Sequence, residues 1–203
     1  MGNRQQMKIW KEITKHIVKD NPKKVLYIGV GKDSLGIIKA FKSYDIHIVG
    51  IDLDKRTNNN NYTHITGDFL EYEFDEKFDL ILNLHILEHQ LNMGLFLDKC
   101  RSILTDNGKM VVAVPNQTDN KVRDGHLTTH WNIGQLMYVL VLCKFDVRQG
   151  RFIKKGNNIV GIVKKSNREL PNNLIMDTGD LAKLKSYFPK SLFGNMEKIN
   201  WFD

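Results

Sequence analysis

The chain has 203 residues, 41% of them hydrophobic, with 30 lysine and arginine residues against 23 aspartate and glutamate residues and a formal net charge of +7. This length and hydrophobic content predict a single domain around one sizeable core. The lysine residues are scattered along the whole chain and do not cluster with aromatic residues, so the positive charge does not favour a nucleic-acid partner.

Helix and strand patterns alternate along the first half of the chain. Apolar residues at helical spacing predict a helix over residues 5–19, which Asn21 and Pro22 end. A turn over residues 106–108 is expected to separate a later helix from the fifth strand. The remaining predicted elements are strands at 24–28, 46–51, 64–66, 78–83 and 109–114 and helices at 34–44 and 91–104.

A long polar stretch, residues 116–131, follows the fifth strand. An amphipathic helix is predicted at about 133–143, and two strands at 145–153 and 158–164 are joined by a hairpin turn at 154–157. Near-continuous apolar strands between helices predict a parallel sheet covered on both faces, and the terminal hairpin adds an antiparallel edge. The predicted fold is an α/β, doubly wound, Rossmann-like sandwich with a mostly parallel sheet.

The apolar runs have the length of strands or form one face of a helix, so we expect no membrane partner. The N-terminus lacks the charged-then-apolar pattern of a secretory signal, which favours a cytoplasmic location. Cys100 and Cys143 both lie in apolar helical patterns, where a thiol behaves as a small hydrophobic side chain.

The most informative motif is an apolar strand that runs into a turn with two glycines, Gly29 and Gly31. A second strand ends about 20 residues later on Asp52. Glycines after a buried strand let backbone N–H groups approach a ligand closely, and an acidic residue at that distance accepts hydrogen bonds from ribose hydroxyls. The pair predicts a nucleoside-cofactor site, with Asp54 as the alternative acidic residue and a purely structural turn as the competing interpretation.

Residues 22–165 resemble the class I S-adenosylmethionine-dependent methyltransferases, in particular the small type 11/type 23 group that modifies metabolites. The resemblance rests on Val25-Leu-Tyr-Ile-Gly-Val-Gly31, on Asp52, on Gly67-Asp-Phe69, on the segment from Phe78 to Glu88-His89, and on the helix, Asn-Gly turn and strand over 97–114. It implies the methyltransferase fold and S-adenosylmethionine as cofactor. Residues 1–21 are then an added N-terminal helix, and 166–203 a tail that packs on the core or on a dimer partner.

The resemblance also assigns cofactor contacts. The glycine turn lies against the methionine part, Asp52 on the ribose, and Asp68 with Phe69 around the adenine. Tyr27 departs from the family pattern, which usually has an acidic residue there, and Asp33 is placed to supply the lost charge. The implied cofactor residues are Gly29, Gly31, Asp33, Asp52, Leu53, Asp68, Phe69, Asn83 and His85.

Catalysis is expected from the polar segment after the fifth strand, at the carboxyl edge of the sheet. Histidine titrates near neutral pH and accepts a hydroxyl proton, so His126 is the first candidate for a general base and His130 the second. Two histidines four apart in a loop, without a helical glutamate, are a poor ligand signature, so we expect no metal there. The candidate acceptor-binding residues are His89, Asp119, Arg123 and Asp124.

The polar, histidine-bearing segment 116–131, here called the lid, predicts an O-methyltransferase for a small polar metabolite. Such an acceptor is a sugar, a nucleotide-sugar or a phosphorylated compound, whose charge Lys121 and Arg123 would neutralise. Two alternatives remain. A nucleic-acid or protein methyltransferase would use the basic surface, but an amide or exocyclic-amine acceptor normally comes with an Asn/Asp-Pro-Pro-Tyr element after the fourth strand, which residues 83–86 lack. A non-catalytic binding module with a retained cofactor fold is favoured by Tyr27. In a further structural alternative, the lid histidines only bond backbone and Trp131 anchors the lid.

Overall fold

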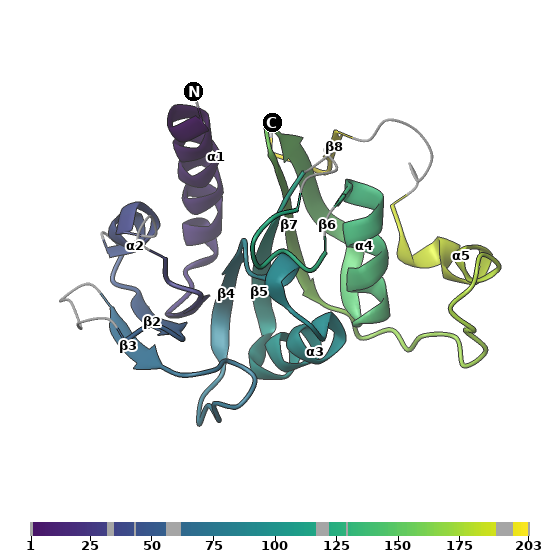
Figure 1. The fold of residues 1–203 in the computed structure, drawn as a ribbon, viewed down its shortest axis with the longest axis horizontal. Coiled ribbons are helices and arrows are strands. Elements are labelled where there is room, and N and C mark those ends of the chain that lie inside the picture. Colours follow the sequence, from purple (N-terminus) through teal and green to yellow (C-terminus); the bar gives the residue numbers. More distant parts are fainter. Residues whose placement is uncertain are drawn as a thin grey trace.

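A computed structural model describes residues 2–31, 35–42, 44–55, 62–116, 122–128, 130–189 and 197–202. Within these residues the strands form one sheet in the order β3-β2-β1-β4-β5-β7-β6-β8. The first five are parallel, and β7, β6 and β8 are antiparallel to their neighbours. The predicted α/β fold, with a mostly parallel sheet that ends in an antiparallel hairpin, is confirmed (Figure 1).

The elements agree closely with the predicted ones. Buried, β-branched or apolar runs form the strands because a strand covered on both faces needs apolar residues at every position. The strands are β1 (Lys24–Ile28), β2 (His47–Asp52), β3 (Thr63–Thr66), β4 (Phe78–Leu84), β5 (Leu104–Pro115), β6 (Phe145–Lys155), β7 (Asn158–Lys165) and β8 (Lys198–Ile199). The helices are α1 (Gly2–Ile17), α2 (Leu35–Lys42), α3 (Met93–Ile103), α4 (Ile133–Leu142) and α5 (Asp180–Leu184).

The fifth strand begins earlier than predicted. β5 starts at Leu104, directly after α3, whereas a turn over 106–108 was expected. Phe78 pairs with Leu104 but Leu80 pairs with Lys109, so the register shifts across this segment. The Asp-Asn-Gly residues form an irregular extension of the strand, because the partner strand β4 already provides pairing at Phe78.

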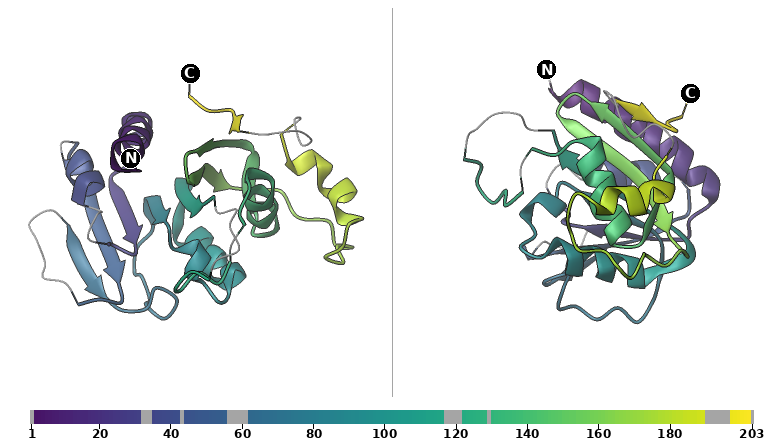
Figure 2. Two further views of the ribbon diagram at one scale, coloured as in Figure 1. Left: turned by 45° about the horizontal axis from the view of Figure 1, so that its top comes forward. Right: turned by 90° about the vertical axis from the view of Figure 1, so that its right-hand side faces the viewer.

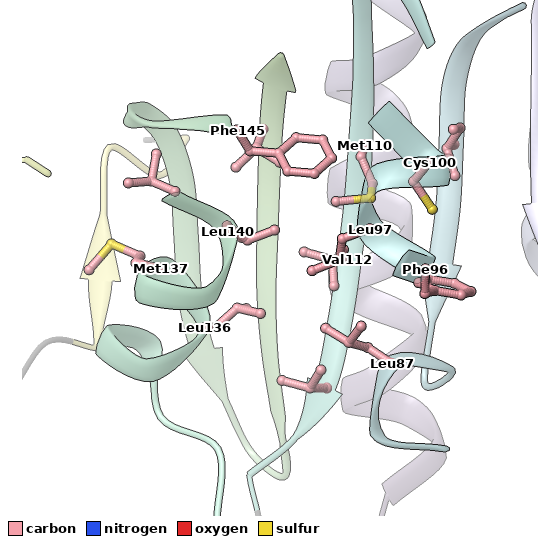
Figure 3. Packing of buried hydrophobic residues seen from close by; sticks show 14 of the residues in the cluster. Leu87, Phe96, Leu97, Cys100, Met110, Val112, Leu136, Met137, Leu140 and Phe145 are labelled. Carbon is pink, nitrogen blue, oxygen red and sulfur yellow. The ribbon is translucent and has the colours of Figure 1, made fainter. Parts of the chain in front are cut away.

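Two apolar clusters cover the two faces of the sheet. One contains α1 and α2 residues such as Ile17 and Phe41, and the other contains residues of α3 and α4. In Figure 3, Leu136 and Leu140 of α4 face Val112 of β5, and Leu97 of α3 lies beside it. The helices therefore lie in two layers, with the sheet between them (Figure 2).

The C-terminal tail returns to the sheet. Leu184 and Phe188 are buried in the α3/α4 cluster, and β8 pairs with β6. Trp201 is buried in the α1/α2 cluster, so the tail contacts both layers. Both ends of the chain consequently lie on the same side of the molecule, with α5 beyond α4 at the far end from β3 (Figure 1). None of the helices in the described ranges combines the length and apolar composition that a membrane span needs.

Candidate active site

The carboxyl ends of the first four strands meet where the strand order reverses, between β1 and β4. The Gly29 N–H donates to the Ile51 carbonyl at 2.8 Å, and the Gly67 N–H donates to the Asp52 carbonyl at 2.9 Å. Across the reversal, Ile28 is in register with Asn83. In open α/β sheets a ligand binds outside the carboxyl ends of the strands at such a reversal.

Gly29 is required by its surroundings. Its φ is +70°, and a Cβ added there would lie 2.0 Å from Cδ1 of Ile86, which follows β4. Gly31 is exposed, and its N–H donates to the Gly29 carbonyl at 2.9 Å. The glycine turn therefore brings bare backbone from the end of β1 against the end of β4.

The two acidic residues predicted for the cofactor lie on neighbouring strand ends. Asp52 is half-buried, and within the described residues its carboxylate accepts one hydrogen bond, from the Asp54 N–H at 3.0 Å. Asp68 is exposed and accepts from the Leu70 N–H at 2.8 Å. Both carboxylates thus have acceptor capacity left at the edge of the sheet.

The apolar residues beside these acids differ in exposure. Leu53 is 74% exposed, whereas Phe69 is buried against Phe74 and Phe96. The assignment of Leu53 to the cofactor stays a prediction. Tyr27 is buried in the α1/α2 cluster, and Asp33 lies outside the described residues.

Buried polar atoms without partners gather at the end of β4. Asn83 is fully buried, and neither atom of its amide has a hydrogen-bond partner among the described residues. The same holds for Nε2 of His85 and Oε2 of Glu88, on the turn that follows β4. Nε1 of the buried Trp131, just before α4, is also unpaired among the described residues. Because unpaired buried polar groups cost free energy, such a concentration indicates a place where a polar ligand binds.

The turn after β4 is held in an unusual conformation. His85 has a φ of +58°, and its N–H donates to the Ala113 carbonyl at 2.9 Å. Its Nδ1 lies 3.3 Å from Oε1 of Glu88. Left-handed backbone at a residue other than glycine persists where the surrounding structure enforces it, most often at functional sites.

The lid segment packs on this turn. The N–H groups of Leu127 and Thr128 donate to the Glu88 carbonyl. Nδ1 of His89 lies 2.8 Å from the Gly125 carbonyl, and the rings of His89 and His126 are edge-to-face with centroids 4.8 Å apart. The side chain of His126 therefore lies next to the turn that follows β4.

The other predicted lid residues lie further out. Arg123, Asp124 and His130 are exposed, and His130 has a φ of +62°. Asp119, Lys121 and Thr129 lie outside the described residues. Glu88 was named from the sequence only as part of the Glu88-His89 ending of the family-like segment and was given no role at the site, although its position three residues after His85 was a signal that the two side chains meet.

Residues 3–148 match the protein family described as "Methyltransferase domain". This match spans well over half of the chain, so the chain belongs to that family. With the fold described above, it is a class I S-adenosylmethionine-dependent methyltransferase, and the predicted cofactor class is confirmed.

Similar proteins act on several kinds of acceptor. A ubiquinone biosynthesis O-methyltransferase of Rhodopseudomonas palustris (strain HaA2) is 30% identical over 105 residues, which are 46% of this chain and 40% of that protein. A probable (S)-tetrahydroprotoberberine N-methyltransferase 2 of Papaver bracteatum is 29% identical over 99 residues, 43% of this chain and 28% of that protein. The chain thus matches less than half the length of these curated relatives.

The solved structures agree on the fold. The Burkholderia thailandensis 1,6-didemethyltoxoflavin-N1-methyltransferase, solved with its named substrate and S-adenosylhomocysteine, has a TM-score of 0.64 at 17% identity and covers 81% of this chain and 80% of its own. At this identity the similarity shows the fold alone.

The residues at the strand ends fit S-adenosylmethionine. Gly29 has no side chain to cover its backbone, Asp52 keeps acceptor capacity for two hydroxyls, and the unpaired amide of Asn83 offers a donor and an acceptor. These three residues would hold the cofactor, which supplies a methyl group on its sulfonium. Which of the predicted residues contact it stays a prediction.

Proposed function

We propose that the chain is an O-methyltransferase whose acceptor is a small polar metabolite, such as a sugar, a nucleotide-sugar or a phosphorylated compound. The observation that carries the proposal is a pair of buried, unpaired polar atoms outside the expected cofactor residues, Oε2 of Glu88 and Nε1 of Trp131. An apolar aromatic acceptor would leave these groups unsatisfied, whereas an acceptor with several hydroxyls pairs with them.

Each group has a role suited to its chemistry. The Trp131 indole N–H only donates, so it would bind an acceptor oxygen, whereas the Glu88 carboxylate only accepts when ionised and would bind a hydroxyl. Arg123 is exposed in the lid, and its guanidinium carries a positive charge that suits an anionic acceptor. Together they would orient the acceptor, which is the main task in an in-line displacement.

A hydroxyl acceptor must also lose its proton. Glu88, His89 and His126 lie together at the end of β4, and His126 is the lid histidine that the sequence favours. We assign removal of the hydroxyl proton to this group of three residues. His130 is exposed and is not part of the group.

The proposal is tested by incubating the protein with S-adenosylmethionine and each member of a panel of sugars, nucleotide-sugars and phosphorylated alcohols. Formation of S-adenosylhomocysteine measures turnover. We expect turnover with at least one member and loss of turnover in Asp52→Ala. Product analysis should place the methyl group on oxygen. Methylation of an RNA or a protein, with no turnover across the panel, would show that the acceptor class is wrong.

A non-catalytic module makes a different prediction. Such a protein would bind S-adenosylhomocysteine but would not form it from S-adenosylmethionine with any acceptor. Binding by calorimetry, compared with turnover by product release, therefore separates a module from an enzyme.

A further inference from the structure

We propose that Glu88, His89 and His126 bind a divalent metal ion of the zinc type. Each residue offers one ligand atom, and the three atoms lie within 4.8 Å of one another. Two imidazoles and a carboxylate are a ligand set that zinc uses in catalytic sites with an open position. His89 and His126 were both candidate site residues, but their contact could not be predicted, because the fold brings them together from 37 positions apart.

Glu88 is the strongest part of the argument. Its side chain is 0% exposed, and Oε2 has no hydrogen-bond partner among the described residues. Among the described residues, Nδ1 of His85 lies 3.3 Å from the other oxygen, Oε1. A buried carboxylate is costly unless a cation or several donors pair with it, and a metal ion at Oε2 meets that need.

The hydrogen bond of His89 leaves one ring nitrogen able to bind the same ion. A carbonyl oxygen only accepts, so the 2.8 Å contact between Nδ1 and the Gly125 carbonyl places the proton on Nδ1. Nε2 then keeps its lone pair. Metal-binding histidines almost always donate their other N–H to a carbonyl or carboxylate in this way, which fixes the tautomer and the ring orientation.

Gly125 shapes this contact. Its φ is +73°, and an added Cβ would lie 3.0 Å from Nδ1 of His89. A side chain at this position would push the His89 ring away from its carbonyl partner. Gly125 is therefore a positioning residue for the site, acting through His89.

The present spacing requires a small closure. Zinc bonds of about 2.0–2.2 Å place ligand atoms roughly 3.4 Å apart in a tetrahedron. The His89 ring is held by Gly125, whereas His126 is only half-buried, so rotation of the His126 side chain can close the gap from 4.8 Å. The buried Glu88 would stay in place as the fixed ligand.

The role of the ion rests on the proposed function, although its binding does not. A metal ion with an open position binds the acceptor oxygen and lowers the pKa of that hydroxyl. The proton then leaves to solvent, the new C–O bond forms, and the C–S bond of the sulfonium breaks to leave a thioether. The group of three residues would then promote loss of the hydroxyl proton through the ion: Glu88 meets the acceptor hydroxyl by way of the metal, and His126 is a ligand and not a separate base.

Calorimetric titration of tag-free, chelator-treated protein with zinc chloride tests the binding. We expect one ion per chain, with affinity weakened at least tenfold in His126→Ala and in Glu88→Gln, which keeps the shape of the buried side chain. Gly125→Ala should weaken it about 10- to 100-fold without removing a ligand. His47→Ala, an exposed histidine at the other end of a strand, is the matched control and should bind normally.

No zinc uptake by the wild-type chain, or equal affinity in all variants, would overturn the site. S-adenosylhomocysteine affinity and circular dichroism, measured on the same variants, verify that each one is folded. If zinc binds as expected but no hydroxyl acceptor is turned over, the proposed function fails and the metal site remains. If turnover with a hydroxyl acceptor is unaffected by complete metal removal, the catalytic role of the ion is wrong.

Discussion

The indole N–H of Trp201 donates a hydrogen bond to Oε1 of Glu12 at 2.8 Å, across 189 positions of sequence. Phe202 stacks on His16 with ring centroids 3.6 Å apart, and the Arg151 guanidinium lies over the same phenyl ring. Trp201 and Phe202 therefore link α1 to β6, in the antiparallel part of the sheet.

This link predicts a graded loss of stability. Trp201→Phe removes the hydrogen bond but keeps a ring, so the free energy of unfolding should fall by about 0.5–1.5 kcal/mol. Trp201→Ala also empties a buried site, and the loss should be about 3–5 kcal/mol. Urea unfolding measures both, and equal values for the two variants would contradict a separate contribution from the hydrogen bond.

Asp52 should control cofactor binding. Asp52→Ala removes the half-buried carboxylate at the end of β2, and the dissociation constant for S-adenosylhomocysteine should rise at least tenfold, or about 1.4 kcal/mol. Asp54→Ala is the control, because its backbone N–H, which bonds Asp52, is retained. A larger loss in Asp54→Ala than in Asp52→Ala would transfer the ribose role to Asp54.

Replacement by alanine should affect stability differently at two glycines of the carboxyl edge. Gly29→Ala meets a positive φ and the Ile86 side chain, so we expect the free energy of unfolding to fall by about 1–3 kcal/mol. Gly67→Ala finds open space and should change it by less than about 0.5 kcal/mol. Thermal unfolding of the pair checks this, and a neutral Gly29→Ala would mean that Ile86 moves aside readily.

The two cysteines should resist alkylation. Burial raises the pKa of Cys143 to about 11 and also raises that of the fully buried Cys100. At pH 8 only about one Cys143 in a thousand is then a thiolate, and the thiolate is the reactive form. Labelling with iodoacetamide should be slow in the native protein, quicken about tenfold per pH unit, and become rapid in urea. Fast labelling of the native protein at pH 8 would contradict this.

Asp180 should make stability depend on pH. Burial alone would raise the pKa of Asp180, but hydrogen bonds from Lys183 and from the N–H groups of residues 175–177 outweigh it and hold the pKa below its ordinary value. A carboxyl with a lowered folded pKa stabilises the protein above its unfolded pKa, and that stability is lost as the pH falls through the folded value.

Asp180→Asn should therefore lower the melting temperature at pH 7 and have a smaller effect at acidic pH, where the wild-type carboxyl is itself protonated. Lys185→Gln, on the following turn, is a charge control. A loss of the same size at both pH values would show that the carboxylate charge is not the stabilising feature.

The fold was predictable from the sequence because its strands are short, apolar and separated by clear turns. The early start of β5 was not, since pairing with Phe78 on β4 extends a segment whose local sequence predicts a turn. β8 has only two residues and forms by pairing with β6, which no local pattern reveals.

The candidate site divides in the same way. Gly29 and Asp52 belong to one strand-turn-strand motif, so their proximity could be predicted from their spacing in the sequence. The approach of His126 to His89 depends on how the lid folds back, and the burial of Glu88 depends on that lid as well. Both are tertiary properties that single-residue patterns do not contain.

The position of β7 bears on how the chain is made. β7 lies between β5 and β6, although it is the last of the three in sequence. A nascent chain that has emerged only to the hairpin turn before Asn158 therefore presents an open edge on β5, where foreign strands could pair. Because β6 reaches β5 only through β7, the antiparallel part of the sheet can form only after residues 158–165 have been synthesised.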